Sequence, residues 1–360
     1  MLPAGDCTRA GGCFAETGYP LSMEILTAQL DPVRAVSGSW QQQMKWAIRD
    51  IQMLRRAVGL PESKENQPKA ASQFPVFAPL PFVSRIKTGD INDPLLKQIL
   101  PVAAEDAQLP GFQSDPLEET EATLAPGLLQ KYHNRVLLVS TGACAIHCRY
   151  CFRREFPYSQ SPTSPKQWEP AIEKIQADTN VDEVILSGGD PLTIVDDNLI
   201  ALIDQLEAIS HVKRLRFHTR LPIMIPQRVT ARLTERLQRF DGQVLMVIHC
   251  NHANEIDDRV AVAIADLKNA GVTLLNQSVL LKGINDDADA LVGLSNRLLE
   301  NGVLPYYLHQ LDRVNGAGHF EVPRERGVQL IAEMRTRLSG YGVPRYVKEE
   351  PGEPNKTVWA

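Results

Sequence analysis

Three cysteines with a close spacing are the residues of this chain best suited to do chemistry. Cys144, Cys148 and Cys151 follow a C-x3-C-x2-C pattern, with an aromatic residue directly before the last cysteine. Thiolates hold iron–sulfur clusters, and a four-iron cubane normally takes four ligands. Three cysteines therefore leave one iron open to a ligand that is not protein. The spacing predicts a 4Fe-4S cluster with one open coordination position.

Two other uses of these cysteines stay open at this point. A structural zinc site would need a fourth ligand in a comparable pair, and the chain downstream offers only isolated His residues and Cys250. A disulfide framework is not needed by a chain of 360 residues with only six cysteines. We therefore interpret Cys7, Cys13 and Cys250 as free thiols.

A glycine-rich turn follows a second apolar run of the chain. Ser187, Gly188, Gly189 and Asp190 come directly after an apolar segment. Two glycines let a backbone come close to a ligand, and the Asp190 carboxylate can accept hydrogen bonds from an ammonium group. A plain turn between a strand and a helix is the alternative interpretation.

Two cationic residues could act on an anionic or carbonyl-bearing ligand. Arg153 lies two residues after the last cysteine of the triplet, and Lys356 lies in a Pro/Gly-rich segment near the end of the chain. A guanidinium can bind a carboxylate with two donors, and a lysine amine can form a Schiff base. Both could instead be solvated surface residues, which is the commoner role of such side chains.

These residues lie at the ends of segments that alternate between two patterns. Six segments read as strands, with periodic helices such as residues 198–209, 259–270 and 287–301 between them. This alternation predicts an α/β fold with a parallel sheet, built as a partial six-unit TIM-like barrel. Functional loops should then lie at the carboxyl ends of the strands. The predicted strands are residues 135–139, 183–187, 214–218, 244–248, 273–278 and 304–308.

The flanking regions are less regular. We predict a leader of uncertain structure over residues 1–22, an N-terminal helical region with a linker over 23–130, the barrel over 131–322, and a C-terminal helix and tail over 323–360. Within the N-terminal region, residues 40–58 show one helical period, with Ser39 as N-cap. Residues 61–75 are polar and flanked by prolines, which indicates a linker.

Composition narrows the class of protein. The net charge is -5, and no basic tail or stripe indicates a nucleic-acid partner. No apolar run approaches the roughly twenty residues of a membrane span, and no segment has the order of a signal peptide. We expect a cytoplasmic protein in a reducing compartment.

Beyond the cysteines, the chain resembles the lysine 2,3-aminomutase family of radical S-adenosylmethionine enzymes from about residue 80 to its end. The closest resemblance within it is to the branch that makes (R)-β-lysine for bacterial elongation factor P. Long ordered segments carry the resemblance, among them YHNRVLLVSTGACAIHCRYCFRREFPY, ILSGGDPL, HTRLPIMIPQRVT, NQSVLLKGIND, PYYLHQLDRVNGAGHF and GEPNKT.

The resemblance implies an isomerase with three cofactors, namely a 4Fe-4S cluster, S-adenosylmethionine and pyridoxal 5'-phosphate. It implies L-lysine as substrate, (R)-β-lysine as product, a flavodoxin- or ferredoxin-type electron donor, and an indirect link to the elongation factor P ligase. In the family, S-adenosylmethionine binds the open iron, and electron transfer from the cluster cleaves it to a deoxyadenosyl radical.

The resemblance also implies a role for individual residues. Lys356 matches the lysine that holds pyridoxal phosphate, and Tyr132 and Arg135 match residues that bind the same cofactor. The turn from Ser187 to Asp190 matches the S-adenosylmethionine segment. Arg153 matches the residue that binds the substrate carboxylate. Asp312 and Glu349 match two acidic positions that receive the far ammonium of lysine, although the enzymes acting on free lysine carry Asp where Glu349 stands.

Three functions remain in competition on the sequence alone. The first is an aminomutase that supplies (R)-β-lysine for elongation factor P. The second is a catabolic or biosynthetic aminomutase acting on lysine or another amino acid. The third is a metal- or redox-binding regulator that keeps only the cysteine triplet. The presence of both Lys356 and Arg153 argues against the regulator, which needs neither.

Overall fold

The computed structural model describes residues 32–63, 68–158, 161–162 and 164–360. The predicted leader over residues 1–22, with Cys7 and Cys13, lies outside the described residues.

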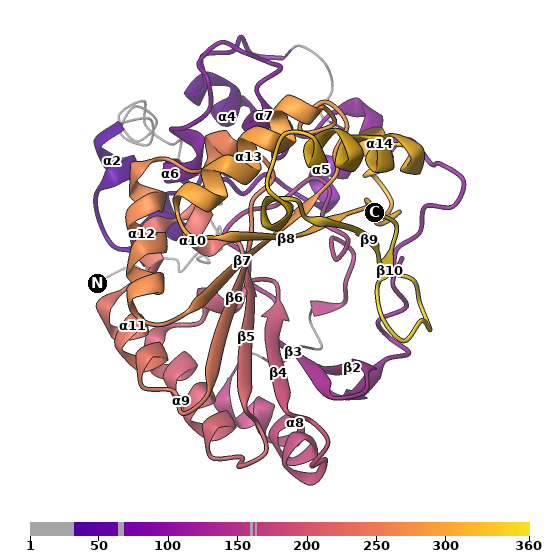
Figure 1. Ribbon diagram of the computed structural model, residues 1–360. Helices are drawn as coiled ribbons and strands as arrows, with labels where there is room; N and C mark the ends of the chain where they lie inside the picture. Colours follow the sequence, from indigo (N-terminus) through magenta and orange to yellow (C-terminus); the bar gives the residue numbers. More distant parts are fainter. Residues whose placement is uncertain (1–31, 64–67, 159–160, 163) are drawn as a thin grey trace, which may run out of the picture.

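A ten-stranded sheet forms the centre of the molecule, with its strands in sequence order from β1 to β10 (Figure 1). All six predicted strands are present and pair parallel with one another. Their buried apolar side chains explain why the sequence pattern found them. They are β3 (Arg135–Thr141), β4 (Glu183–Gly188), β5 (Arg214–Thr219), β6 (Gln243–His249), β7 (Thr273–Val279) and β8 (Leu304–His309).

A helix crosses between each pair of consecutive parallel strands. Aspartates or threonines cap several of these helices, as where the Asp287 carboxylate accepts from the backbone N–H of Ala290 at 2.8 Å. The predicted helices α9, α12 and α13 are confirmed to within two residues. The crossover helices are α8 (Pro165–Ala177), α9 (Asp196–Glu207), α11 (Ala231–Gln238), α12 (Asp258–Asn269), α13 (Ala288–Glu300) and α14 (Arg324–Arg335).

Four short strands at the two edges of the sheet were not predicted. Strands β1 (Thr123–Ala125) and β2 (Leu128–Tyr132) pair antiparallel beside β3. At the other edge, β9 (Arg345–Lys348) pairs parallel with β8, and β10 (Thr357–Val358) pairs antiparallel with β9. The parallel part therefore has seven strands, one more than predicted. The predicted α/β fold with a parallel sheet and N-terminal helices is confirmed, although the sheet of the predicted partial barrel is mixed and only mostly parallel.

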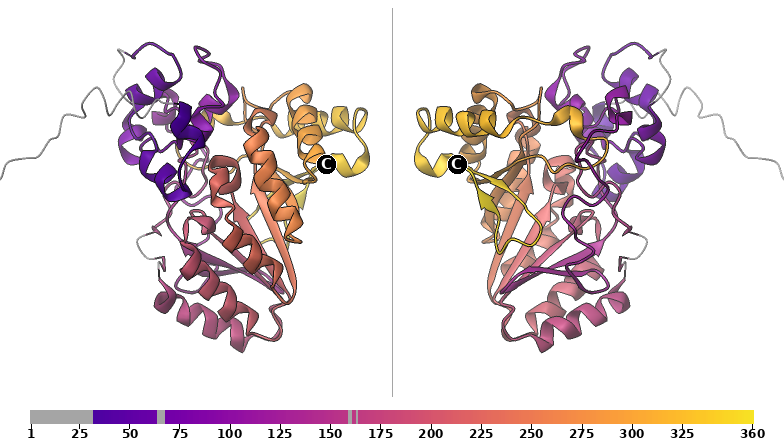
Figure 2. Two further views of the ribbon diagram at one scale, coloured as in Figure 1. Left: turned by 90° about the vertical axis from the view of Figure 1, so that its left-hand side faces the viewer. Right: turned by 90° about the vertical axis from the view of Figure 1, so that its right-hand side faces the viewer.

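The N-terminal helices lie at the end of the sheet where the parallel strands finish (Figures 1 and 2). The single helix predicted over residues 40–58 is wrong, because the chain forms two helices there. Ala47 takes an extended conformation, Ile48 pairs with Ala78, and the Asp50 side chain caps a second helix. The elements of this region are α2 (Pro32–Val36), α3 (Trp40–Trp46), α4 (Ile51–Ala57), α5 (Lys69–Gln73), α6 (Leu80–Val83), α7 (Pro94–Lys97) and η1 (Ala103–Asp106).

Part of the predicted linker is also helical. Helix α5 lies inside residues 61–75, and the Asp106 carboxylate accepts from the backbone N–H groups of Lys69 and Ala70 at 3.0 and 2.8 Å. Asp106, which accepts from these two N–H groups, is 36 or more positions away in the sequence. The local sequence therefore does not predict that a helix begins here.

One apolar core joins the N-terminal helices to the sheet. Trp40, Ile48 and Phe82 from the N-terminal region pack in the same buried cluster as Leu215 and Phe217 of β5. These side chains are between 0% and 5% exposed, so their burial stabilises both parts together. Within the described residues, no helix is both long enough and apolar enough to span a membrane.

Candidate functional site

A cavity of about 550 Å³ opens at the carboxyl ends of the parallel strands. It has the size of a site for small organic molecules. All thirteen residues that the sequence singled out for the site line this cavity, although they are spread over more than 220 positions of the chain. These residues are Tyr132, Arg135, Cys144, Cys148, Cys151, Arg153, Ser187, Gly188, Gly189, Asp190, Asp312, Glu349 and Lys356.

The three cysteines lie on the loop after β3 and are partly exposed to the cavity as free thiols. Burial raises the pKa of Cys144, and it raises the pKa of Cys151 to about 11. Nowhere in the described chain do three His, Cys, Asp or Glu side chains converge as the ligands of a single metal ion. The ligands of a cubane lie farther apart than those of a single zinc ion, because each cysteine binds a different iron. Cys250 is fully buried and does not line the cavity.

The two glycines after β4 make room for the cysteine loop. Gly188 has a φ of +122°, and a Cβ there would collide with the carbonyl oxygen of Thr141. A Cβ on Gly189 would collide with the carbonyl oxygen of Ala143. The Gly189 and Asp190 N–H groups donate to these same two carbonyls at 2.8 and 2.7 Å. The close approach expected toward a ligand is thus, in this structure, an approach to the loop that carries the cysteines.

The Asp190 carboxylate is already saturated with donors. It accepts from the backbone N–H groups of Leu192, Arg220 and Leu221 and from the Thr219 hydroxyl, at 2.7 to 3.0 Å. A carboxylate offers about four acceptor positions. The structure therefore does not support the expectation that Asp190 accepts from an ammonium; its contacts tie the end of β4 to the end of β5.

Arg153 is buried and holds a carboxylate of the protein itself. Its Nε and Nη2 donate to Glu119 at 2.6 and 2.7 Å, and its Nη1 donates to the Ser187 hydroxyl at 3.1 Å and the Gly188 carbonyl at 3.3 Å. Burial opposes ionisation of Glu119, but Arg153 outweighs it and lowers the pKa of that carboxyl. Arg153 lines the cavity, and among the described residues its Nη2 donates only to Glu119, which leaves one Nη2 hydrogen for a ligand.

Sequence reasoning gave Glu119 no role. It lies in the irregular segment before β1, where the sequence has no helical or strand periodicity that would predict a buried side chain. The Lys131 ammonium, 3.8 Å from both Glu119 and Glu349, was also not predicted, because it lies on β2, a short edge strand that the sequence pattern did not reveal. The stacked rings of Tyr306 and Tyr307 on β8 also line the cavity, and only their position near a strand end could have indicated this.

Lys356 lies far from the cysteines in the sequence, just before β10, but it lines the same cavity. Its ammonium pairs with Glu349, which also accepts from the Tyr132 hydroxyl at 2.8 Å. Burial lowers the pKa of Lys356 to about 8, against the opposing effect of Asp312. Asp312 itself pairs with Lys348 at 3.2 Å. The two predicted acidic residues and the predicted cofactor lysine are therefore brought together.

Three histidines at the ends of β5, β6 and β8 line the same cavity, namely His218, His249 and His309. Burial lowers the pKa of all three, that of His249 to about 3, so they are neutral near pH 7. The buried Nε2 of His218 has no hydrogen-bond partner within the described part of the chain. A buried polar atom without a partner, facing a cavity, indicates a site that fits a polar ligand.

Comparison with known proteins agrees with this geometry. Residues 138–294 match the model of the Radical SAM superfamily. The chain is thus a radical SAM protein, a class that implies a 4Fe-4S cluster and S-adenosylmethionine.

The relatives define the family more closely. The chain is 46% identical to the L-lysine 2,3-aminomutase of Haemophilus influenzae over 92% of this chain and 98% of the relative. It is 47% identical to the L-lysine 2,3-aminomutase of Escherichia coli over 88% and 93% of the two chains. For the enzyme of that name from Clostridium subterminale, the identity is 36% over 88% and 77%. The chain belongs to the L-lysine 2,3-aminomutase family.

Proposed function

We propose that this protein is an L-lysine 2,3-aminomutase, an isomerase that moves the α-amino group of L-lysine to Cβ and yields (R)-β-lysine. The observation that carries the proposal is one cavity lined by the cysteine triplet, Lys356, Arg153 and the acidic pair. A regulator that only bound a cluster would need neither a partly buried lysine nor two carboxylates beside it.

The residues suit the two cofactor sites that this reaction needs. Cys144, Cys148 and Cys151 would hold the cluster, and the turn from Ser187 to Asp190 would form one wall of the S-adenosylmethionine site. Lys356, Tyr132 and Arg135 would hold pyridoxal phosphate. When bound, the cluster with S-adenosylmethionine supplies a carbon radical, and pyridoxal phosphate supplies an aldehyde that carries the substrate amine.

Lys356 can serve as the cofactor lysine because its amine is partly neutral near pH 8. A neutral amine is the nucleophile in Schiff-base formation, and desolvation is a recognised way to produce it. The neutral state of His218, His249 and His309 keeps further positive charge away from this amine.

Substrate selection follows from the charges at the two ends of the cavity. Arg153 offers its remaining Nη2 hydrogen to the substrate carboxylate, while Glu119 holds the guanidinium in place. Asp312 and Glu349 favour a side chain that ends in a cation. Glutamate would put a third carboxylate beside them, and repulsion is strong where water is scarce.

The test is a product assay with separate amino acids. Anaerobically reduced, reconstituted protein with S-adenosylmethionine and pyridoxal phosphate should convert L-lysine to (R)-β-lysine, resolved on a chiral column. Lys356→Ala should lose the conversion and keep its iron, whereas Lys166→Ala, at an exposed position on α8, should match the wild type. Preferential conversion of glutamate, or no β-amino acid from any substrate, would overturn the proposal.

We further propose that the β-lysine modifies elongation factor P and that a flavodoxin- or ferredoxin-type protein reduces the cluster in the cytoplasm. The resemblance of the long segments to that branch supports this destination. The ligase for elongation factor P should then attach the product in preference to α-lysine. Equal attachment of the two would favour a catabolic or biosynthetic aminomutase.

A further inference from the structure

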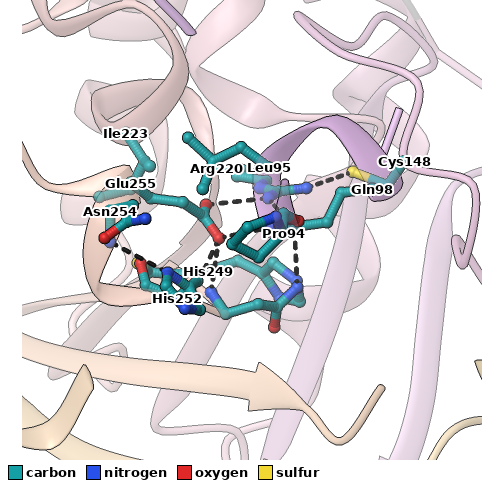
Figure 3. Close-up of polar contacts among 12 residues, drawn as sticks. Pro94, Leu95, Gln98, Cys148, Arg220, Ile223, His249, His252, Asn254 and Glu255 are labelled. Atoms are coloured by element: carbon teal, nitrogen blue, oxygen red, sulfur yellow. Dashed lines mark hydrogen bonds and ion pairs between the residues drawn. The ribbon is translucent and has the colours of Figure 1, made fainter. Parts of the chain in front are cut away.

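Arg220 connects one cysteine of the triplet to a fully buried polar network. It follows β5, and its backbone N–H is fixed by the Asp190 carboxylate at 2.7 Å. Its Nη1 donates to the Cys148 sulfur at 2.7 Å and to the Tyr150 hydroxyl at 2.6 Å. Figure 3 shows the guanidinium between Cys148 on one side and Glu255 on the other.

The opposite edge of the guanidinium also donates two hydrogen bonds. Its Nη2 donates to Glu255 at 2.9 Å and to the Gln98 side-chain oxygen at 2.5 Å. Glu255 is completely buried and accepts from Gln98 and from the backbone N–H groups of Asn251 and His252 at 2.9 to 3.1 Å. Gln98 belongs to the N-terminal region, so residues from three distant parts of the chain fix this one cation.

Two buried charges at this position are less favourable for stability than a purely apolar core would be. Burying an arginine and a glutamate removes both from water, and apolar side chains of similar size are often at least as stabilising. The negative partner lies on the far side of the guanidinium from the sulfur. Arginine stays protonated in proteins, so Cys148 faces a permanent positive charge. The Nε of Arg220 has no partner among the described residues, which leaves one more donor at this site.

We propose that Arg220 tunes the cluster by stabilising its reduced state through Cys148. This inference rests on the proposed function, in which Cys148 is a cluster ligand. One-electron reduction adds one negative charge to the cluster and its sulfurs. A cation donating to a ligand sulfur favours the more negative state, and hydrogen bonds to sulfur are a main determinant of cluster potential. In a site shielded from water the attraction is larger than at a surface.

The experiment measures the midpoint potential of the full-length, reconstituted protein, without S-adenosylmethionine or substrate. Dithionite is the reductant, and the EPR signal of the reduced cluster is followed against potential. Arg220→Gln should bind as much iron as the wild type and should titrate at a more negative potential. Arg220→Lys should fall between the two, because it keeps the charge but cannot serve Cys148, Gln98 and Glu255 at once.

Arg228→Gln is the matched control. Arg228 is also buried and ion-paired, with Asp196 at 2.8 Å, but it packs on Trp40 and does not line the cavity. Its variant should lose stability without a change in potential. The double variant Arg220→Gln/Glu255→Gln removes both buried charges, so it tests the potential if the single variant is too unstable to titrate.

The outcomes separate this inference from the proposed function. Equal potentials for wild type and Arg220→Gln at equal iron content would overturn the tuning role. Loss of iron in both the single and the double variant, with iron kept in Arg228→Gln, would also overturn it, because Arg220 would then be needed for assembly. Iron kept in Cys148→Ala but lost in Cys250→Ala would instead contradict the ligand assignment itself.

Discussion

The amine of Lys356 lies where its charged form is poorly solvated. Burial lowers its pKa from 10.5 to about 8, and Asp312 limits the decrease by favouring the ammonium. About half of the Lys356 amines are then neutral at pH 8, whereas an ordinary lysine is neutral only near pH 10 and above. The partly buried amine is therefore a nucleophile under conditions in which surface lysines are not.

This difference predicts a pH profile for modification of Lys356. Labelling by acetic anhydride, followed by mass spectrometry of the peptide, should rise with pH to a midpoint near 8. A free lysine peptide in the same mixture should have its midpoint above 10. Asp312→Asn removes one of the groups that favour the ammonium, so its midpoint should move below that of the wild type. A Lys356 midpoint near that of the free peptide would contradict the prediction.

Individual functional residues could be recognised from the sequence, but their present partners could not. Arg153 was predicted to offer two parallel donors to a substrate carboxylate, and Glu119 now occupies them. Glu349 was predicted to receive a substrate ammonium, and it now pairs with Lys356. These pairs join residues far apart in the chain, and nothing local in the sequence specifies them.

At the scale of elements, η1 of the N-terminal region clamps the loop that carries the cysteines. The Glu105 carboxylate accepts from Arg149 Nε at 2.9 Å and from Arg149 Nη2 at 2.5 Å, and it also accepts from Arg154 at 3.0 Å. Its side chain and that of Arg149 are 0% exposed. These two arginines flank Cys151, so one carboxylate of the N-terminal region holds both sides of the last cysteine.

Glu105→Gln should therefore destabilise the protein strongly. It leaves two buried guanidinium groups without their negative partner, a change that costs about 3–5 kcal/mol in unfolding free energy. Urea unfolding under reducing conditions measures this change in unfolding free energy. Glu300→Gln is the control, because Glu300 is 62% exposed and pairs with Arg297 at 3.4 Å, so it should change stability by at most about 1 kcal/mol. Equal effects of the two substitutions would count against the clamp.

The long parallel elements were predictable, and the short ones were not, for physical reasons. Strands such as β4 are buried over their whole length and read as apolar runs. By contrast, β1 and β10 have three and two residues and are partly exposed. They are too short to show the alternation of apolar and polar residues that predicts a strand. The break between α3 and α4 depends on the pairing of Ile48 with Ala78, a contact across 30 positions that the helical period does not reveal.

At the scale of the whole molecule, the site is assembled from distant parts of the described chain. Glu119 and Lys131 come from before the cysteine loop, whereas Asp312, Glu349 and Lys356 come from the last fifth of the sequence. The wall of the cavity that carries Glu349 and Lys356 is present only if the C-terminal tail stays folded onto the sheet. Lys356 is placed by the segment that follows it, since β10 begins at the next residue.

The tail is fastened by its last residues. Trp359 N–H donates to the Tyr346 carbonyl at 2.8 Å, and the Tyr346 N–H donates to the Ala360 carbonyl at 2.9 Å. The Trp359 ring packs edge-on against Tyr346 at 5.4 Å, and the Arg324 guanidinium lies over it at 4.4 Å. Tyr346 is fully buried against α14, where a Cβ on Gly327 would collide with its ring. The position of Lys356 thus depends on the packing of one tryptophan.

Trp359→Ala should loosen the tail without disturbing the cysteine loop. The aromatic and the cation–π contact each contribute about 0.5–1.5 kcal/mol, so loss of both should weaken retention of pyridoxal phosphate by roughly 5- to 150-fold. Iron content should be unchanged, because the cysteine loop is held by Glu105 and not by the tail. Equilibrium dialysis against pyridoxal phosphate, with iron analysis of the same samples, measures both quantities.

Tyr341→Ala is the control for the loss of an aromatic ring in the same region, because Tyr341 is 69% exposed and is not part of the tail contact. It should retain pyridoxal phosphate as the wild type does. If Trp359→Ala retained the cofactor equally well, the tail would not position Lys356. If it lost iron in parallel, the two halves of the site would be coupled, and Lys131, 3.8 Å from both Glu349 and the Glu119 that binds Arg153, offers one route.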